Sequence, residues 1–251
     1  MQQKPVTEKV QKNVQNVVED AKQELAAARR PWYRAIRWGF ILLGVYAIQL
    51  TLFALLAFWV HFHPVLPVDV AITREFQENQ SPWLRFTMIA VSYLGYNFIL
   101  FSLLSLLTAV FFWLLRLRLE AIMVVALSIV STFLNGAIKL IVARPRPSAS
   151  LVEVIQAASG QSFPSGHVMS YLAYFGLVFS LGVILFYGKR WWRMALLIIP
   201  ALFVVLVGPS RIYLGDHWAS DVLGAYLIGG VLLGLTLWLY LLLKKKGVLS
   251  T

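Results

Sequence analysis

Three short segments of the chain place phosphate-binding and proton-transferring side chains beside apolar runs. They are KLIVARPRP at 139–147, PSGH at 164–167 and SRIYLGDHWASD at 210–221. In the first, Pro145 and Pro147 end a helix and keep the chain extended, so Arg146 on the loop can return towards Lys139 at the helix end. An arginine fork and a lysine point charge together suit a phosphate. Taken alone, the pair also fits side chains that reach for lipid headgroups.

The second segment combines backbone donors with a histidine. Ser165 and Gly166 are expected at a helix start, where free N–H groups and the helix dipole attract an anion. The Ser165 hydroxyl adds a donor, the missing side chain of Gly166 lets the backbone approach closely, and His167 can donate a proton. Taken alone, Ser165 is an ordinary N-cap and His167 a histidine at the membrane interface.

The third segment offers a nucleophile. His217 and Asp221 are four residues apart, so we expect them to share one face of a helix. A carboxylate there would hold the imidazole in one tautomer and leave its other nitrogen free to attack. Arg211 adds a third cation. Taken alone, the segment also fits a helix-capping Asp near a chance His, but the three segments together complete one phosphoryl-transfer site.

The elements that carry these segments are apolar. Of the 251 residues, 59% are hydrophobic and 13% are charged, and the mean hydropathy is +0.74. Soluble domains are about 45–50% apolar and about 25% charged, so much of this chain must face lipid. The length suits one membrane domain. With no cysteine, disulfides, thiolate metal sites and a cysteine nucleophile are excluded.

Six stretches are long and apolar enough to span a bilayer, which takes about 20 residues. They cover 37–60, 96–115, 119–142, 167–187, 194–210 and 221–243, the fifth being short. We therefore predict an all-α integral membrane bundle of six helices over 31–246, with an apolar interfacial stretch before the second span. Residues 1–30 form a polar cytosolic arm in which one narrow apolar face predicts a short amphipathic helix. That arm could be a solvated helix, lie on the membrane surface or make a weak coiled-coil contact.

The net charge of +11 reflects topology rather than nucleic-acid binding, because the basic residues flank the apolar runs. With six spans, four basic groups fall on one side, which is then cytoplasmic. They are Arg29–Arg37, Arg116–Arg118, Lys189–Arg193 and Lys244–Lys246. Both chain ends are then inside a plasma or inner membrane, and the three chemical segments face the extracytoplasmic side. Arg144, Arg146 and Arg211 lie where the charge rule disfavours them, which indicates another role.

The three segments resemble the signature of the type 2 phosphatidic acid phosphatase superfamily, which also includes vanadium haloperoxidases and glucose-6-phosphatase. The resemblance covers about 119–243, fills every signature position in order and implies a role for each residue. His217 would be the nucleophile, Asp221 its partner and His167 the general acid. The phosphate would be held by Lys139, Arg146, Ser165, Gly166 and Arg211. Arg144 and Asp216 are left outside this predicted site.

The resemblance implies a membrane lipid phosphatase that forms a phosphohistidine and needs no metal or other cofactor. Its partner would be a phosphorylated lipid in the bilayer: phosphatidylglycerophosphate, phosphatidic acid, diacylglycerol pyrophosphate or undecaprenyl pyrophosphate. The signature does not distinguish these four. A vanadate-dependent haloperoxidase is the first alternative, but known members of that branch are soluble. A non-catalytic lipid-binding or transport protein is the second, and the complete set of His167, His217 and Asp221 argues against it.

Overall fold

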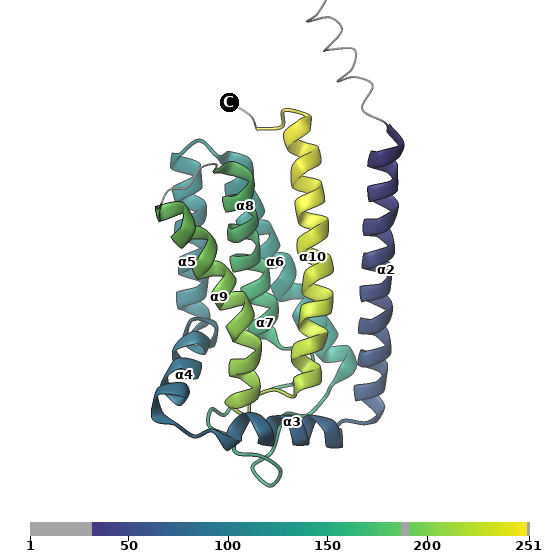
Figure 1. Ribbon diagram of the computed structural model, residues 1–251, viewed down its shortest axis with the longest axis vertical. Helices are drawn as coiled ribbons and strands as arrows, with labels where there is room; N and C mark the ends of the chain where they lie inside the picture. The colour runs from purple at the N-terminus through teal and green to yellow at the C-terminus, as the bar shows by residue number, and fades with distance from the viewer. Residues whose placement is uncertain (1–31, 187–190, 250–251) are drawn as a thin grey trace, which may run out of the picture. The chain divides into compact units, whose positions relative to one another are not determined.

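The computed structural model describes residues 32–186 and 191–249, and these form helices without any strand (Figure 1). The predicted amphipathic helix in 1–30, and Lys189 and Arg190, lie outside the described residues. The chain divides into two units, residues 1–47 and 48–251. In chain order the helices are α2 (Trp32–Phe62), α3 (Pro67–Glu78), α4 (Pro82–Tyr96), α5 (Phe98–Leu114), α6 (Arg118–Val142), α7 (Gly166–Tyr171), α8 (Leu177–Leu185), α9 (Trp191–Tyr213) and α10 (Ala219–Lys245), with a π-helical segment over Leu172–Gly176 between α7 and α8.

The predicted all-α integral membrane fold is confirmed. Among the described residues, five helical segments are long and apolar enough to cross a membrane, and a sixth follows if α4 and α5 count as one broken span. These two helices meet at an angle of 72°. Asn97 sits at the break and caps α5, because its Oδ1 accepts a hydrogen bond of 3.1 Å from the Leu100 N–H. The apolar stretch expected before the second span forms helix α4.

Helix α9 is longer than the short fifth span expected at 194–210, because it runs over Trp191–Tyr213. Its last turn carries Ser210 and Arg211, which lower the local hydropathy and end the apolar stretch in the sequence. Both residues are buried in the protein. A polar side chain inside a membrane helix is tolerated when it faces protein rather than lipid, so the helix continues past the apolar limit.

Helix α3 turns a polar face inward. Asp69, Thr73 and Gln77 recur every four residues and are all buried, whereas Val68 and Phe76 are exposed. The Gln77 amide donates to the carbonyls of Glu153 and Tyr213 at 2.7 and 2.9 Å. The exposed side of α3 is mixed, because the charged residues Arg74, Glu75 and Glu78 are exposed as well. The buried polar face holds the loop between α6 and α7 and the end of α9.

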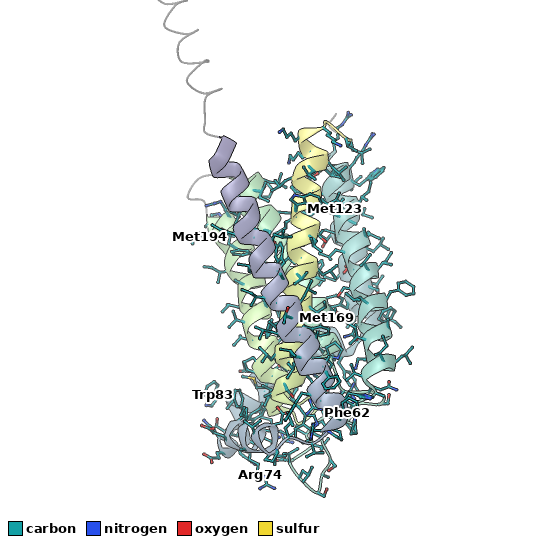
Figure 2. All side chains as sticks on the ribbon, turned by 90° about the vertical axis from the view of Figure 1, so that its right-hand side faces the viewer. Phe62, Arg74, Trp83, Met123, Met169 and Met194 are labelled. Carbon is teal, nitrogen blue, oxygen red and sulfur yellow. The ribbon has the colours of Figure 1, made fainter. Side chains whose placement is uncertain are left out.

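The second unit has its core among α6, α7, α8, α9 and α10, with α5 packed on α6 and α4 packed on α9. Figure 1 shows α3 and the loop between α6 and α7 at one end of this unit. The α5–α6 turn and the end of α10 lie at the other end. Figure 2 agrees from the side, with Arg74 and Trp83 at the α3 end and Met123 and Met194 towards the opposite end. Two of the basic groups, Arg116–Arg118 and Lys244–Lys246, therefore lie far from α3.

Candidate active site

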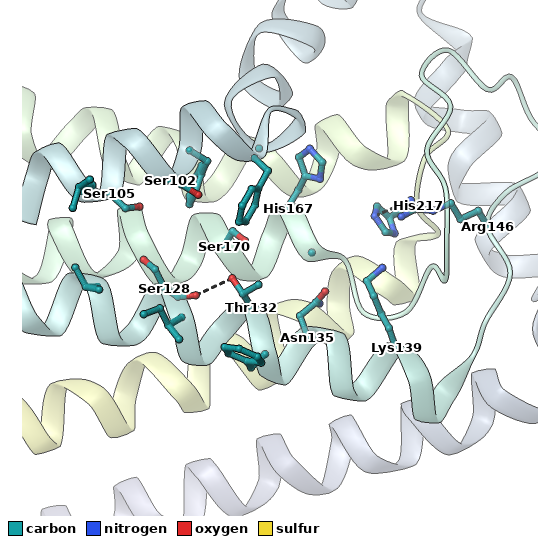
Figure 3. A pocket seen from close by; sticks show the side chains of 18 residues that line it. Ser102, Ser105, Ser128, Thr132, Asn135, Lys139, Arg146, His167, Ser170 and His217 are labelled. Atoms are coloured by element: carbon teal, nitrogen blue, oxygen red, sulfur yellow. Dashed lines mark hydrogen bonds between the residues drawn. The ribbon is translucent and has the colours of Figure 1, made fainter.

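Lys139 and Arg146 line one cavity of about 630 Å³, together with Gly166, His167 and His217. Figure 3 shows the labelled histidines, the lysine and the arginine gathered at one end of that cavity. Helix α6 ends at Val142, and Ala143 takes the left-handed conformation with φ 50° and ψ 34°. The extended chain that follows brings Arg146 back beside the last turn of the helix, as Pro145 and Pro147 predict. The Lys139 ammonium donates to the carbonyl of Gln161.

His217 does not share a helix face with Asp221, so that prediction is wrong. Helix α10 begins only at Ala219, and His217 lies in the turn before it. The turn needs Gly215, whose φ is +68° and whose place leaves no room for a Cβ atom, which would lie 2.1 Å from the Glu153 carbonyl oxygen. Asp221 instead acts at the helix start, where its carboxylate accepts a 2.9 Å hydrogen bond from the Trp218 N–H.

The turn still brings the imidazole of His217 to the carboxylate. Its Nδ1 lies 3.5 Å from Asp221 Oδ2 and 3.4 Å from Ser162 Oγ, while its Nε2 lies 3.2 Å from Arg146 Nη1. Ser162 in turn donates to the Asp221 carboxylate. With a proton on Nδ1 facing these oxygens, Nε2 keeps its lone pair on the side of the cavity.

The surroundings keep His217 uncharged. Burial lowers its pKa well below the usual range, and the cations of Arg146, Arg211 and Lys139 lower it further. Burial also lowers the pKa of Arg146, while the charge of Asp221 raises it. A neutral imidazole among cations is the form that can attack an electrophile.

The PSGH segment forms the expected helix start. Ser165 is the residue before α7 and Gly166 is its first residue. Ser165 is fully buried but does not cap the helix with its side chain. The Oγ of Ser165 and the Nε2 of His167 have no hydrogen-bond partner among the described residues. Helix α4 approaches the His167 ring at Gly95, where a Cβ atom would lie 2.5 Å from His167 Cδ2.

Arg211 is not among the residues that line this cavity. Its side chain is fully buried and contacts the Asp216 carboxylate and the Ser92 hydroxyl. The same carboxylate accepts a hydrogen bond of 2.9 Å from Arg146 Nη1. Asp216 therefore links two arginines that the sequence assigned to phosphate, although the sequence left Asp216 outside the site.

Arg144, which the sequence also left outside the site, joins helix α3 to the start of helix α10. Its buried guanidinium donates to Asp221 Oδ1 at 2.6 Å, to Asp69 Oδ2 at 2.7 Å and to Ser220 Oγ at 2.7 Å. Asp69 also accepts from the Ser220 N–H at 2.9 Å. The sequence carried two signals of this network. One is an arginine on the side of the membrane where the charge rule disfavours positive charge, and the other is the polar residues that repeat every four positions from Asp69.

Cations outnumber carboxylates in this region. The described cations are Lys139, Arg144, Arg146 and Arg211, and the described carboxylates are Asp69, Asp216 and Asp221. With four cations and three carboxylates, one positive charge remains for an anion even when the histidines are neutral. The arrangement can bind a phosphoryl group between Lys139 and Arg146 with an imidazole nitrogen facing it.

Known proteins resemble this chain in sequence and in fold. The chain is 32% identical over 181 residues to phosphatidylglycerophosphatase B of Bacillus subtilis (strain 168), covering 70% of this chain and 85% of that protein. It is 30% identical over 128 residues to the putative undecaprenyl-diphosphatase YbjG of Escherichia coli (strain K12), covering 49% and 60% of the two chains.

Two solved structures resemble the structure of this chain. The transmembrane PAP2 type phosphatidylglycerolphosphate phosphatase from Bacillus subtilis superposes with a TM-score of 0.67 at 28% identity, covering 77% of this chain and 94% of that one. Aquifex aeolicus LpxE shares the fold with a TM-score of 0.51 at 24% identity, covering 69% and 96%. Residues 119–245 match the family model described as PAP2 superfamily. With half of the chain matched by that model, this protein belongs to the PAP2 superfamily.

Proposed function

We propose that the protein is an integral-membrane phosphatase that removes phosphate from a lipid, with His217 as the nucleophile and no metal in the reaction. One observation carries the proposal: the neutral His217 imidazole turns Nδ1 to Asp221 and Nε2 to Arg146, in a cavity that Lys139 and His167 also line. Phosphoryl transfer to histidine needs an imidazole that a carboxylate holds in place. It also needs phosphate-binding cations and a second histidine facing that imidazole.

The first half-reaction transfers the phosphoryl group. Its equatorial oxygens are held by Lys139 and Arg146, with the Ser165 hydroxyl and the Gly166 N–H as further donors. Arg211 adds positive charge behind Arg146, since the Asp216 carboxylate pairs with both arginines. The Nε2 lone pair of His217 forms a bond to phosphorus as the bond to the leaving oxygen breaks, and a protonated His167 donates its proton to that oxygen. The products are the dephosphorylated lipid and a phosphohistidine.

The second half-reaction restores the enzyme. His167, now neutral, takes a proton from a water molecule whose oxygen attacks phosphorus, and the P–N bond to His217 breaks. Inorganic phosphate leaves, and His167 is protonated again for the next cycle. Asp221 keeps Nδ1–H in place throughout and offsets the positive charge that the ring gains when its Nε2 is phosphorylated.

The substrate class follows from the cavity walls. Beyond the cations, aromatic and aliphatic side chains of α5 and α6 line the cavity, including Phe98, Leu106, Ile129 and Phe133. Both helices belong to membrane-spanning elements, so a lipid can present its phosphate while its tails stay apolar. The relatives named for phosphatidylglycerophosphate and undecaprenyl diphosphate support a lipid monoester or pyrophosphate as substrate.

The test is phosphate release from phosphatidic acid in detergent micelles containing EDTA. We expect release by the wild-type protein, inhibition by vanadate, loss of at least about 10³-fold in kcat for His217→Ala, and little change for the control His63→Ala, whose side chain is exposed. A brief reaction with radiolabelled lipid should leave an acid-labile label on the wild-type chain and none on His217→Ala. Activity that requires added metal, or full activity in His217→Ala, would overturn the proposal.

A further inference from the structure

Packing, rather than a hydrogen bond to Nε2, holds the His167 imidazole in place. Its Nε2 is buried and has no hydrogen-bond partner among the described residues. Gly95, near the end of α4, lies so close to the ring that a Cβ atom there would be 2.5 Å from His167 Cδ2 and 3.1 Å from its Cγ. The position of α4 against α7 therefore limits where this ring can lie.

Tyr171 joins these two helices. It is the last residue of α7 and follows His167 by four positions, so the two side chains leave the same side of the helix. The buried Tyr171 hydroxyl donates a hydrogen bond of 2.5 Å to the Val91 carbonyl and accepts one of 3.1 Å from the Gly95 N–H. Both partners belong to the backbone of α4, and one of them is the glycine that lies against the His167 ring.

The place of this contact on α4 sets it apart from ordinary packing. A carbonyl and the N–H four residues later are the pair that an α-helix joins by its own hydrogen bond. The Tyr171 hydroxyl contacts both members of such a pair, Val91 and Gly95. A side chain that enters the helix ladder in this way is one cause of helix bending, and α4 ends at Tyr96, just before the 72° break to α5. Tyr171 thus fixes the end of α4 to α7.

We propose that Tyr171 is a positioning residue for His167, because its hydroxyl holds Gly95 against the imidazole and so keeps that ring aimed at the leaving oxygen. This rests on the proposed function, in which His167 protonates that oxygen. Tyr171 is not among the residues that line the cavity, so it acts through His167 rather than on the substrate. Without the hydroxyl, the Val91 carbonyl and the Gly95 N–H still have each other as partners, but α4 is no longer tied to α7.

The test uses two substrates that differ in their need for a proton. Dodecyl phosphate releases an alcohol, whose oxygen must be protonated as the P–O bond breaks. A nitrophenyl phosphate that carries the same dodecyl chain releases a stable phenolate, which needs no proton. The kcat/KM of each is measured in detergent micelles, because it reports the barrier to phosphoryl transfer from free enzyme and substrate. We expect Tyr171→Phe to lower kcat/KM at least about tenfold for dodecyl phosphate, as part of the general-acid effect, and less than about twofold for the nitrophenyl ester.

Two further variants accompany this measurement. The control Tyr174→Phe removes a buried hydroxyl of the same kind, which pairs with Thr108 Oγ1 on α5 at 2.6 Å and not with α4. It should leave the kcat/KM of both substrates nearly unchanged. Gly95→Ala adds a Cβ atom directed at the His167 ring and should lower kcat/KM mainly for dodecyl phosphate, as Tyr171→Phe does.

An equal effect on both substrates in Tyr171→Phe or in Gly95→Ala would overturn the inference, because a residue that serves only the fold does not distinguish leaving groups. No effect of Tyr171→Phe on either substrate would overturn it as well. His167→Ala separates this inference from the function on which it rests. If His167→Ala spares the nitrophenyl ester and Tyr171→Phe does not, only the role of Tyr171 is wrong. If His167→Ala lowers both substrates equally, the proposed general acid is itself wrong.

Discussion

At His217, the two ring nitrogens face different surroundings, and that difference sets the protonation state on which the reaction depends. Nδ1 faces Asp221 and Ser162, while Nε2 faces Arg146. The carboxylate favours a charged ring, but burial and the three neighbouring cations act in the opposite direction and lower the pKa. The proposed nucleophile is thereby kept in its neutral form, and the carboxylate favours the tautomer with the proton on Nδ1.

This balance predicts how His217 titrates. Its pKa in the folded protein lies below that of a free histidine, so the neutral ring persists as the pH falls through about 6.5 and is lost only at lower pH. Replacing Arg146 by Gln removes one of the cations that lower the pKa, so the pKa should rise towards the usual value while burial still keeps it depressed.

The measurement is an NMR titration of ring-labelled histidine in micelles, with the His217 signal assigned from His217→Gln. The same titration is recorded for Arg146→Gln, in which the His217 signal should move to higher pH. A His217 signal that titrates at or above pH 7 in the wild-type protein would contradict the neutral nucleophile.

Among the helices, α3 has the least expected role. It lies outside the family signature, yet its Asp69 forms an ion pair of 2.7 Å with Arg144, which holds Asp221 at the start of α10 at 2.6 Å. Three elements far apart in the sequence thus meet at one buried guanidinium. Through Arg144, helix α3 helps to hold the carboxylate that lies beside His217.

Removing the α3 carboxylate should therefore be costly. Asp69→Ala leaves Arg144 with one anion where it had two, and breaking a buried pair costs about 3–5 kcal/mol. The matched control is Arg85→Gln, which removes the exposed 3.9 Å pair with Glu153 and should cost less than about 1 kcal/mol. Unfolding in detergent, followed by tryptophan fluorescence, gives both values. Equal stabilities of the two variants would show that the Asp69 pair contributes little.

Within the second unit, two of the basic groups lie at the opposite end from the candidate site. The α5–α6 turn and the end of α10, which carry Arg116, Arg118 and Lys244–Lys246, lie at the end away from α3 (Figure 1). The candidate site is joined to α3 through Asp69, Arg144 and Asp221. Because basic residues favour the cytoplasmic side, we propose that the site faces outward. An outward site would meet lipids that have crossed the bilayer.

Sidedness can be tested with single cysteines, because the chain contains none of its own. A cysteine at Ser150, exposed in the loop between α6 and α7, should react with an impermeant maleimide in intact cells. A cysteine at Lys245, exposed at the far end of α10, should react only after permeabilisation. The reverse labelling pattern would place the site in the cytoplasm.

Much of this protein can be predicted without its structure. A membrane span must be a long apolar helix because lipid satisfies no backbone hydrogen bond, so the spans are visible as apolar runs. The phosphate chemistry is also visible, because Lys139, Arg146, His167 and His217 belong to short local segments. Those four side chains do line one cavity.

What the sequence alone does not determine is which distant groups become neighbours. It missed the link of Arg144 to Asp69 and the link of Asp216 to two arginines. It also placed His217 on a helix that begins two residues later. The assignment of Arg211 to the phosphate stays a prediction. The periodicity of a sequence shows which face of a helix is polar and which is apolar. It does not show a pairing across 75 residues, as between Asp69 and Arg144, because that pairing depends on which helix ends pack together. Only the tertiary structure decides that packing.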